Sequence, residues 1–209
     1  MENIKKILAL VFMITILISC NKPTLKEAEV LIKAAKYKEA IKIIRPLAKK
    51  GNDNAQFDLG SMYYLGKGVK QDYKKAIKWH TKAAEQGYAK SQYNLGGIYF
   101  YGQGVTRDYK EAIKWHTKAA NQGYPEAQFS LGIIYDRGEE DFLMMDPTLT
   151  KHQLRVTKNY VEAYKWYYLA ASQNERHAEY RDDLGKKMTK EQIAEAKKLA
   201  FEFVAKKEK

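Results

Sequence analysis

Internal repetition constrains this chain more than any other feature of its sequence. Aligning residues 51–86 with residues 87–122 gives 21 identities in 36 positions. A third copy begins at Gly123 and resumes at Asn159 after an insertion at residues 139–158. All three tryptophans share one repeat position, at Trp79, Trp115 and Trp166. A fixed period of this length indicates stacked supersecondary units that share one continuous core.

Each copy is predicted to form two antiparallel helices. In the first copy, the first helix carries Ala55, Leu59 and Tyr63 at helical spacing. A Gly66-x-Gly68 turn follows, because glycine adopts the left-handed conformation at a helix C-terminus at little cost. The second helix of each copy begins after a residue that favours the N-cap position, namely Asp72, Asp108 and Asn159.

Small residues recur inside the predicted first helices, at Gly60, Gly96 and Gly132. Glycine in a helix costs about 1 kcal/mol relative to alanine, so its recurrence predicts that a neighbouring helix passes close by. Glu111 and Glu162 stand three residues after their N-caps, at the spacing of a capping box. One hairpin cannot bury its apolar face alone, whereas stacked hairpins can. The sequence therefore predicts an all-α protein built as an α-solenoid.

This pattern of residues resembles the Sel-one-like repeat family, which is related to the tetratricopeptide repeats. The matching residues of the first copy are Ala55, Leu59, Gly60, Tyr63, Gly66, Gly68, Val69, Asp72, Ala76, Trp79, Ala83, Ala84 and Gly87. The second copy departs only at Ser91, and the third lacks the Gly-x-Gly-Val turn where the insertion begins. The resemblance implies a right-handed α-solenoid of stacked antiparallel hairpins, with about 36 residues per repeat and a loop insertion in the third full repeat.

The rest of the chain divides around these repeats. Residues 24–50 are predicted to form an N-terminal capping hairpin, residues 51–173 the three repeats, and residues 174–209 the C-terminal capping helices, since a solenoid needs polar ends. Residues 1–19 have a basic head and a short apolar run, which is typical of a secretory signal peptide. Residues 20–23 are then the lipidated N-terminus and a short tether.

The end of this signal peptide is more specific. The segment Leu17-Ile18-Ser19-Cys20 resembles a bacterial lipobox, which implies cleavage before Cys20 and acylation of that cysteine. Two or more acyl chains anchor a protein stably, so we expect a periplasm-facing protein of the bacterial cell envelope. A plain signal peptide or an uncleaved anchor is the alternative. Asn21 stands where many inner-membrane lipoproteins have Asp, which favours the outer membrane.

The chain is basic, with 37 Lys and Arg against 25 Asp and Glu. An exported protein should not meet nucleic acid inside the cell, so the charge indicates a solvated face first, and anionic lipid or an acidic protein partner second. His80 and His116 lie one repeat apart, too far to share a metal ion. Motifs of metalloproteases, phosphate-binding loops and serine hydrolases are absent from the sequence. We therefore predict no catalytic residue, no metal site and no cofactor.

Two features are candidates for binding another protein. In the tetratricopeptide geometry the first helices line the concave face, where aromatic and small residues form a row that suits an extended peptide or a helix. This row comprises Phe57, Ser61, Tyr64, Tyr93, Gly97, Phe100, Phe129, Ile133 and Asp136. The inserted loop adds Phe142, Met144 and Met145. The alternatives are that Phe57, Tyr93 and Phe129 pack against the next repeat, and that the apolar residues of the loop fold back onto the solenoid.

These expectations predict a non-catalytic protein-interaction module that functions as a monomer on the membrane. The resemblance also extends to exported repeat proteins that neutralise toxins, including phospholipase effectors, so an immunity protein is one alternative. An envelope hydrolase and a cell-wall-associated adaptor are the others.

Overall fold

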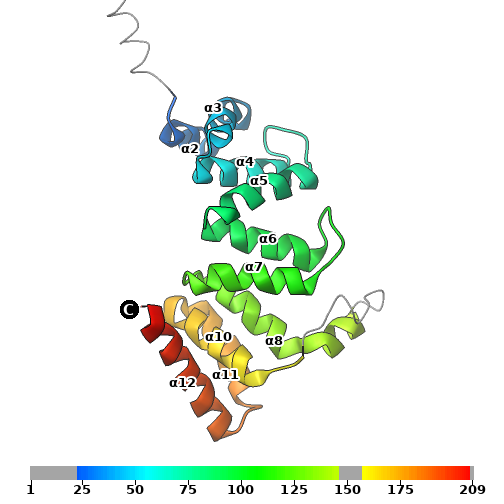
Figure 1. The fold of residues 1–209 in the computed structure, drawn as a ribbon, viewed down its shortest axis with the longest axis vertical. Coiled ribbons are helices and arrows are strands. Elements are labelled where there is room, and N and C mark those ends of the chain that lie inside the picture. Colours follow the sequence, from blue (N-terminus) through cyan, green and yellow to red (C-terminus); the bar gives the residue numbers. More distant parts are fainter. Residues whose placement is uncertain (1–22, 146–156, 208–209) are drawn as a thin grey trace, which may run out of the picture.

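The computed structural model describes residues 23–145 and 157–207, and within these ranges every regular element is a helix. The helices are α2 (Leu25–Lys33), α3 (Tyr37–Lys49), α4 (Asp53–Leu65), α5 (Tyr73–Glu85), α6 (Ala89–Tyr101), α7 (Tyr109–Asn121), α8 (Pro125–Met145), α10 (Tyr160–Gln173), the short 3-10 helix η1 (Glu175–His177), α11 (Ala178–Gly185) and α12 (Lys190–Lys207). From α2 to α10, each helix packs on the next one along the chain. This succession produces the elongated stack of Figure 1, with α2 and α3 at one end and α10 to α12 at the other. The predicted α-solenoid is confirmed.

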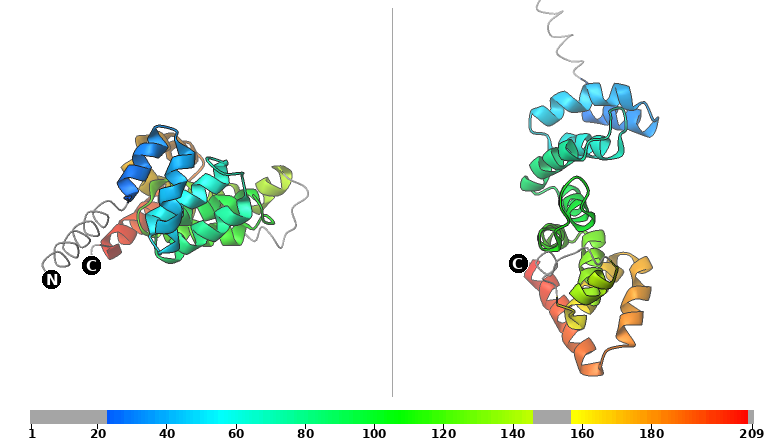
Figure 2. Two further views of the ribbon diagram at one scale, coloured as in Figure 1. Left: turned by 90° about the horizontal axis from the view of Figure 1, so that it is seen from above. Right: turned by 90° about the vertical axis from the view of Figure 1, so that its right-hand side faces the viewer.

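Three hairpins form the body of the solenoid: α4 with α5, α6 with α7, and α8 with α10. Figure 2 shows the same stack from two further directions. The side chains of Asp72, Asp108 and Asn159 each accept a hydrogen bond from the backbone N–H three residues later, at 2.9, 3.0 and 3.0 Å. Each therefore satisfies a donor that the helix leaves unpaired, as the sequence predicts.

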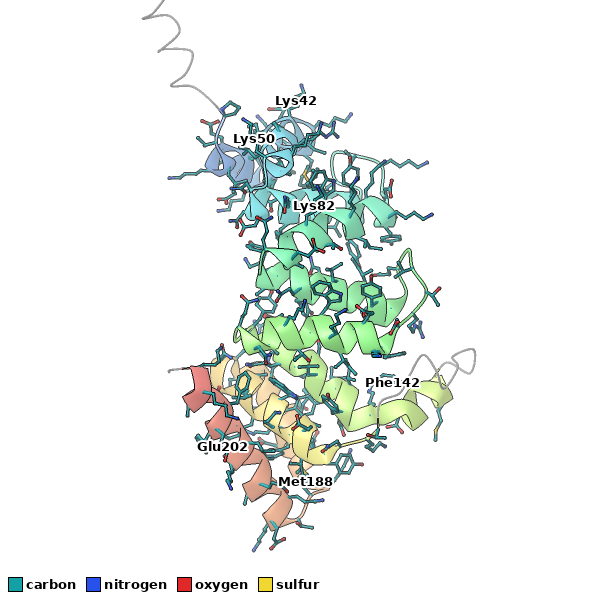
Figure 3. The ribbon with its side chains drawn as sticks, viewed as in Figure 1. Lys42, Lys50, Lys82, Phe142, Met188 and Glu202 are labelled. Carbon is teal, nitrogen blue, oxygen red and sulfur yellow. The ribbon has the colours of Figure 1, made fainter. Side chains whose placement is uncertain are left out.

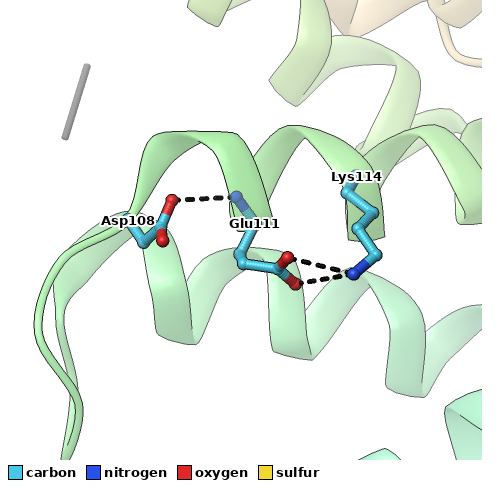
Figure 4. Close-up of polar contacts among 3 residues, drawn as sticks. All are labelled: Asp108, Glu111 and Lys114. Atoms are coloured by element: carbon cyan, nitrogen blue, oxygen red, sulfur yellow. Dashed lines mark hydrogen bonds and ion pairs between the residues drawn. The ribbon is translucent and has the colours of Figure 1, made fainter. Parts of the chain in front are cut away.

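The predicted capping boxes at Glu111 and Glu162 are only half formed. Figure 4 shows the reason in α7: the carboxylate of Glu111 accepts from the Nζ of Lys114 at 3.0 and 3.2 Å instead of reaching back to Asp108. Glu162 likewise pairs with Lys165. An ion pair three residues along the helix competes successfully with the return bond of the box. Complete boxes occur instead at the starts of α2 and α12.

The close approach predicted from the helix glycines is confirmed. A Cβ atom added to Gly96 would lie 2.5 Å from the His116 ring, and one on Gly60 would lie 3.0 Å from the His80 ring. In the third hairpin Tyr167 takes the place of the histidine, 2.4 Å from a Cβ on Gly132. The two helices of each hairpin therefore meet where a glycine of the first receives a ring of the second.

Neighbouring repeats are also joined by a ladder of buried glutamines that the sequence analysis did not single out. The side-chain amide of Gln92 donates to the Ala84 carbonyl of the preceding repeat at 3.0 Å and accepts from Gln122 at 2.8 Å. The same pair of bonds occurs at Gln56 and at Gln128. Buried polar groups need such partners, so the ladder sets the register between repeats.

The insertion differs from the predicted loop at its beginning. Helix α8 continues to Met145, so residues 139–145 are helical, and the chain kinks at Gly138, which has φ 64° and ψ −177°. Gly138 lies 36 residues after Gly102, so the third copy retains the first glycine of the turn that it was expected to lack. The Asn159 N–H still donates to the Tyr135 carbonyl at 2.8 Å, as the Asp108 N–H does to Tyr99 at 2.9 Å. The insertion therefore returns to the regular repeat geometry at Asn159.

Candidate partner-binding cavity

A cavity of about 530 Å³ lies between α6 and α8, the first helices of the second and third repeats. It is called the α6–α8 cavity below. Its lining comes from α6, from the end of the turn before α7, from α7 and from α8: Tyr93, Gly97, Phe100, Tyr101, Arg107, Tyr109, His116, Ser130, Ile133, Arg137 and Phe142. Three helices from two repeats thus converge on one hollow, which exists only when the repeats are stacked.

Aromatic rings form much of the wall. The rings of Phe100 and Tyr109 lie 5.0 Å apart, and Phe142 lies 4.7 Å from Tyr109 and 5.6 Å from Phe100. Phe142 belongs to the extension of α8, where Figure 3 labels it. Because α8 bends at Gly138, this extension brings Phe142 onto α7. The insertion and the predicted aromatic row therefore contribute to the same cavity.

The charged residues that line the cavity are both cationic. Arg107 is the residue directly before Asp108, the N-cap of α7, and Arg137 directly precedes Gly138, where α8 kinks. No carboxylate is among the lining residues of the described chain. The electrostatic potential inside a hollow is stronger when its charges share one sign and its walls are apolar, because aromatic side chains screen charge less than water does. The cavity therefore favours an anionic group.

His116 lines the inner wall of the cavity, and one of its ring nitrogens has no hydrogen-bond partner among the described residues. Burial lowers the pKa of His116 to about 4, so its imidazole is neutral at pH 7. Its Nδ1 has no hydrogen-bond partner within the described residues. The equivalent His80 has Ser91 Oγ of the second repeat 3.4 Å from its Nδ1, whereas the third repeat has Ala127 in the place of Ser91, opposite His116. The lost hydroxyl explains the unsatisfied nitrogen.

A smaller hollow of about 170 Å³ adjoins the first, sharing Tyr93, Gly97 and Tyr101 with it. Tyr64 lines it and donates its hydroxyl to Gln103 Oε1 of the next repeat at 2.6 Å. No charged residue lines this hollow. The surface between α4 and α8 is thus apolar and aromatic at one end and cationic at the other.

The predicted row falls partly on this surface. Tyr93, Gly97, Phe100, Ile133 and Phe142 line the α6–α8 cavity, and Tyr64 lines the smaller one. Phe57 and Phe129 are half-buried and pack on rings: Phe57 lies 5.3 Å from Tyr88 of the next repeat, and Phe129 stacks on His177 at 4.3 Å. Ser61 is half-buried outside both hollows.

Two further predicted residues of the described chain, Asp136 and Met144, line neither hollow. Asp136 is half-buried beside Tyr167, whose pKa is raised by burial and then by this carboxylate. Met144 is 80% exposed on the α8 extension. The side chain of Met145, like Cys20, lies outside the described part of the structure. Binding by any of these residues stays a prediction.

Phe142 follows the alternative in which the apolar residues of the insertion fold back onto the solenoid. It is 3% exposed, so it is not an exposed contact of the insertion, and partner binding by Phe142 stays a prediction. Its ring folds back on Tyr109 because a large apolar side chain gains more from burial than from exposure to water. It reaches a partner only as part of the cavity wall.

Sequence reasoning missed Tyr101, Arg107, Tyr109, His116, Ser130 and Arg137. A signal for the arginines exists in the repeat. Arg137 stands where the other copies have Leu65 and Tyr101, and Arg107 stands where the first copy has Gln71. Departure from the repeat consensus thus marks the two arginines, whereas Tyr109 and His116 repeat Tyr73 and His80 of the first copy.

Acidification is expected to destabilise the protein through its two buried histidines. Burial lowers the pKa of His80 and of His116 to about 4, below the unfolded value near 6.5. Stability from each is present above pH 6.5 and is lost as the pH falls toward 4, about 2 kcal/mol per histidine between pH 6.5 and 5. Asp58 acts in the opposite direction, because burial, and then Glu29, raise its pKa to about 6.

Urea unfolding at pH 7 and pH 5 measures this effect. The His116→Gln variant should lose about 2 kcal/mol less than the native protein between the two values. An unchanged pH dependence in this variant would contradict the burial of a neutral His116.

Within the described residues, no group of three or more His, Cys, Asp or Glu side chains is arranged to hold a metal ion. The helices described here include none long and apolar enough to cross a bilayer.

The stacked hairpins and their shared cavity define a helical repeat protein of the solenoid class. The Sel1 repeat family model matches residues 53–88, 89–124, 125–143 and 152–175, which together make up more than half of the chain. The protein belongs to the Sel1 repeat family. The first three matches begin at the N-termini of α4, α6 and α8.

Solved structures agree with this assignment. A Sel1 repeat protein from Oxalobacter formigenes is 34% identical, with a TM-score of 0.60, over 74% of this chain and 58% of its own. The protein c5321, a protective antigen in uropathogenic Escherichia coli strains with an SLR fold, is 18% identical with a TM-score of 0.52, over 89% of this chain and 62% of its own. The present chain thus spans less than two thirds of either relative.

The immunity protein Pa5087 from Pseudomonas aeruginosa is 16% identical over 88% of this chain and 85% of its own, and its TM-score of 0.36 supports no inference. Among curated protein sequences, none matches this chain. The Sel1 repeat fold suggests a protein-interaction module, and its repeats are in general those of scaffolds rather than of enzymes.

Proposed function

We propose that this protein is a non-catalytic interaction module, anchored by lipid in the bacterial cell envelope, that binds a partner protein through the α6–α8 cavity. The cavity itself carries the proposal. Its volume of about 530 Å³ lies in the range of pockets that enclose a ligand group, and it continues into the smaller hollow beside it. A continuous apolar surface between first helices suits an extended segment of another protein.

The side chains around the cavity favour binding over catalysis. Ser130 is the only serine among the lining residues, and its hydroxyl donates to the Glu126 carbonyl of its own helix at 2.9 Å. His116 also lines the cavity, burial lowers its pKa to about 4, and no carboxylate among the described residues bonds its Nδ1 to orient it as a base. A hydrolase needs a nucleophile, a base and a group that orients the base. The envelope hydrolase alternative therefore finds no support in this cavity.

Site-specific photo-crosslinking in living cells tests the proposal. A photoreactive amino acid replaces Tyr101, which is 63% exposed and lines both hollows, in one strain. It replaces the exposed Lys198 on α12 in a control strain. We expect one protein adduct of defined mass from position 101 and none of that mass from position 198. Adducts from neither position, or the same adducts from both, would refute a partner in the cavity.

The identity of the adduct separates the remaining alternatives. A secreted toxin of a competing bacterium would make the protein an immunity protein, such as one against a phospholipase. Several envelope proteins in weak yield would make it an adaptor.

Replacement of Cys20 with alanine is expected to abolish lipid attachment. The native protein should incorporate labelled palmitate and sediment with membranes, because two or more acyl chains hold a protein stably at a bilayer. The variant should incorporate none, since the chain has no other cysteine. An Asn21→Ala variant serves as the matched control and should remain labelled. Equal membrane association of the native and Cys20→Ala proteins would rule out this anchor.

A further inference from the structure

We propose that the partner segment bound in the α6–α8 cavity presents a carboxylate next to an aromatic or large apolar side chain. This inference rests on the proposed function and specifies the chemistry of the partner. The carboxylate lies toward Arg107 and Arg137, and the apolar side chain lies against Tyr93, Phe100 and the smaller hollow.

The arginines supply the charge complementarity. Both line the cavity, which has no acidic lining residue among those described. Each already makes an interaction within the chain, but a guanidinium has five N–H donors, so it can bind a carboxylate as well. Arginine pairs with carboxylates through two parallel hydrogen bonds, and such charge-assisted bonds are stronger where water is partly excluded. The partner group that fits these residues is therefore an Asp or Glu side chain or a chain terminus.

The neighbouring walls fit an apolar side chain. Tyr93 packs on the His116 ring at 5.5 Å and on Tyr124 of the next repeat at 5.3 Å, as the packing alternative predicts, and it is half-buried and still lines the cavity. Gly97 presents no side chain, and a Cβ built on it meets nothing within 4 Å. A partner can therefore approach the α6 backbone here and place a ring among Tyr93, Phe100 and Ile133. Aromatic contacts of this kind add to the affinity gained by burial.

The difference between the two hollows gives the segment a direction. The smaller hollow is lined by Tyr64, Asn94 and Tyr101 among others, with no charge. The first repeat has Leu65 and Gln71 at the positions of Arg137 and Arg107, so the cationic pair belongs to the junction of the second and third repeats. The carboxylate is thus expected at the α8 side and the apolar side chain toward α4.

Selection from a phage-displayed library of random dodecapeptides tests this chemistry with the full-length protein. We expect the enriched peptides to carry net negative charge and at least one aromatic residue. A variant with Arg107→Gln and Arg137→Gln should lose the acidic preference and bind the best acidic peptide at least about tenfold more weakly. The control has Lys74→Gln and Lys78→Gln, two exposed lysines of α5, and removes the same charge from another surface. It should select the same peptides as the native protein.

A second double variant guards against misfolding. Arg107→Lys with Arg137→Lys keeps both charges, and it should retain the acidic preference with reduced affinity. Enrichment of neutral or basic peptides, no enrichment, or an acidic preference that survives in the variant with Arg107→Gln and Arg137→Gln would each overturn the inference. A photo-crosslinked partner at Tyr101 together with any of these results would leave the proposed function standing and reject only the carboxylate.

Discussion

Replacing Gly96 with alanine is expected to lower the free energy of unfolding by about 3 kcal/mol, the upper part of the range for overpacked cores. The added Cβ would lie 2.5 to 2.7 Å from three atoms of the His116 ring. That ring is 2% exposed, so it has little room to move away. Either α6 or α7 must shift, and the shift would disturb the stacking on both neighbouring repeats. Urea unfolding of the purified protein measures the loss.

The adjacent glycine provides the matched control. A Cβ on Gly97 meets nothing within 4 Å, so Gly97→Ala should raise stability by up to about 1 kcal/mol, the difference in helix propensity. The two variants thus make the same chemical change one residue apart and are expected to differ in sign. Combining Gly96→Ala with His116→Ala should recover part of the loss, because the smaller residue makes room for the Cβ. Equal effects of the two glycine variants would show that α6 and α7 do not meet at Gly96.

Most of the fold could be predicted from the sequence because the same helix-forming, capping and turn residues recur in each copy of the repeat. The N-caps at Asp72, Asp108 and Asn159 depend only on local residue chemistry. The glycines at one repeat position indicated a close approach without showing which ring fills it. The structure of the insertion was harder to predict. Gly138 is not followed by a second glycine two residues later, so the Gly-x-Gly turn of the other copies is not recognisable in the sequence. The helix beyond Gly138 also has no counterpart in the other copies.

The site was less predictable because it depends on contacts between repeats. The row was predicted from the tetratricopeptide geometry, and Tyr93, Phe100 and Ile133 do line the cavity. Arg107 and Arg137 belong to different hairpins, and they line one cavity only because the two hairpins are stacked. The glutamine ladder is a similar case, because Gln92 bonds a backbone carbonyl that no residue pattern identifies.

Phe142 decides what the insertion contributes. Truncation to alanine in Phe142→Ala is expected to cost about 3 kcal/mol, as for other buried phenylalanines, because the ring packs on Phe100 and Tyr109. Met144, two residues along the same helical extension, is 80% exposed, so Met144→Ala should change stability by no more than about 0.5 kcal/mol. Urea unfolding and crosslinking from position 101 are measured together for both variants.

The combination of the two measurements distinguishes three roles for the insertion. Loss of both stability and crosslinking in Phe142→Ala shows that the insertion builds the cavity wall, as the structure indicates. Unchanged stability with loss of crosslinking would make Phe142 a direct contact residue, as first predicted from the sequence, and would contradict its packing on α7. Loss of crosslinking in Met144→Ala alone would place the partner on the exposed side of the extension. The cavity would then be only one part of a wider binding surface.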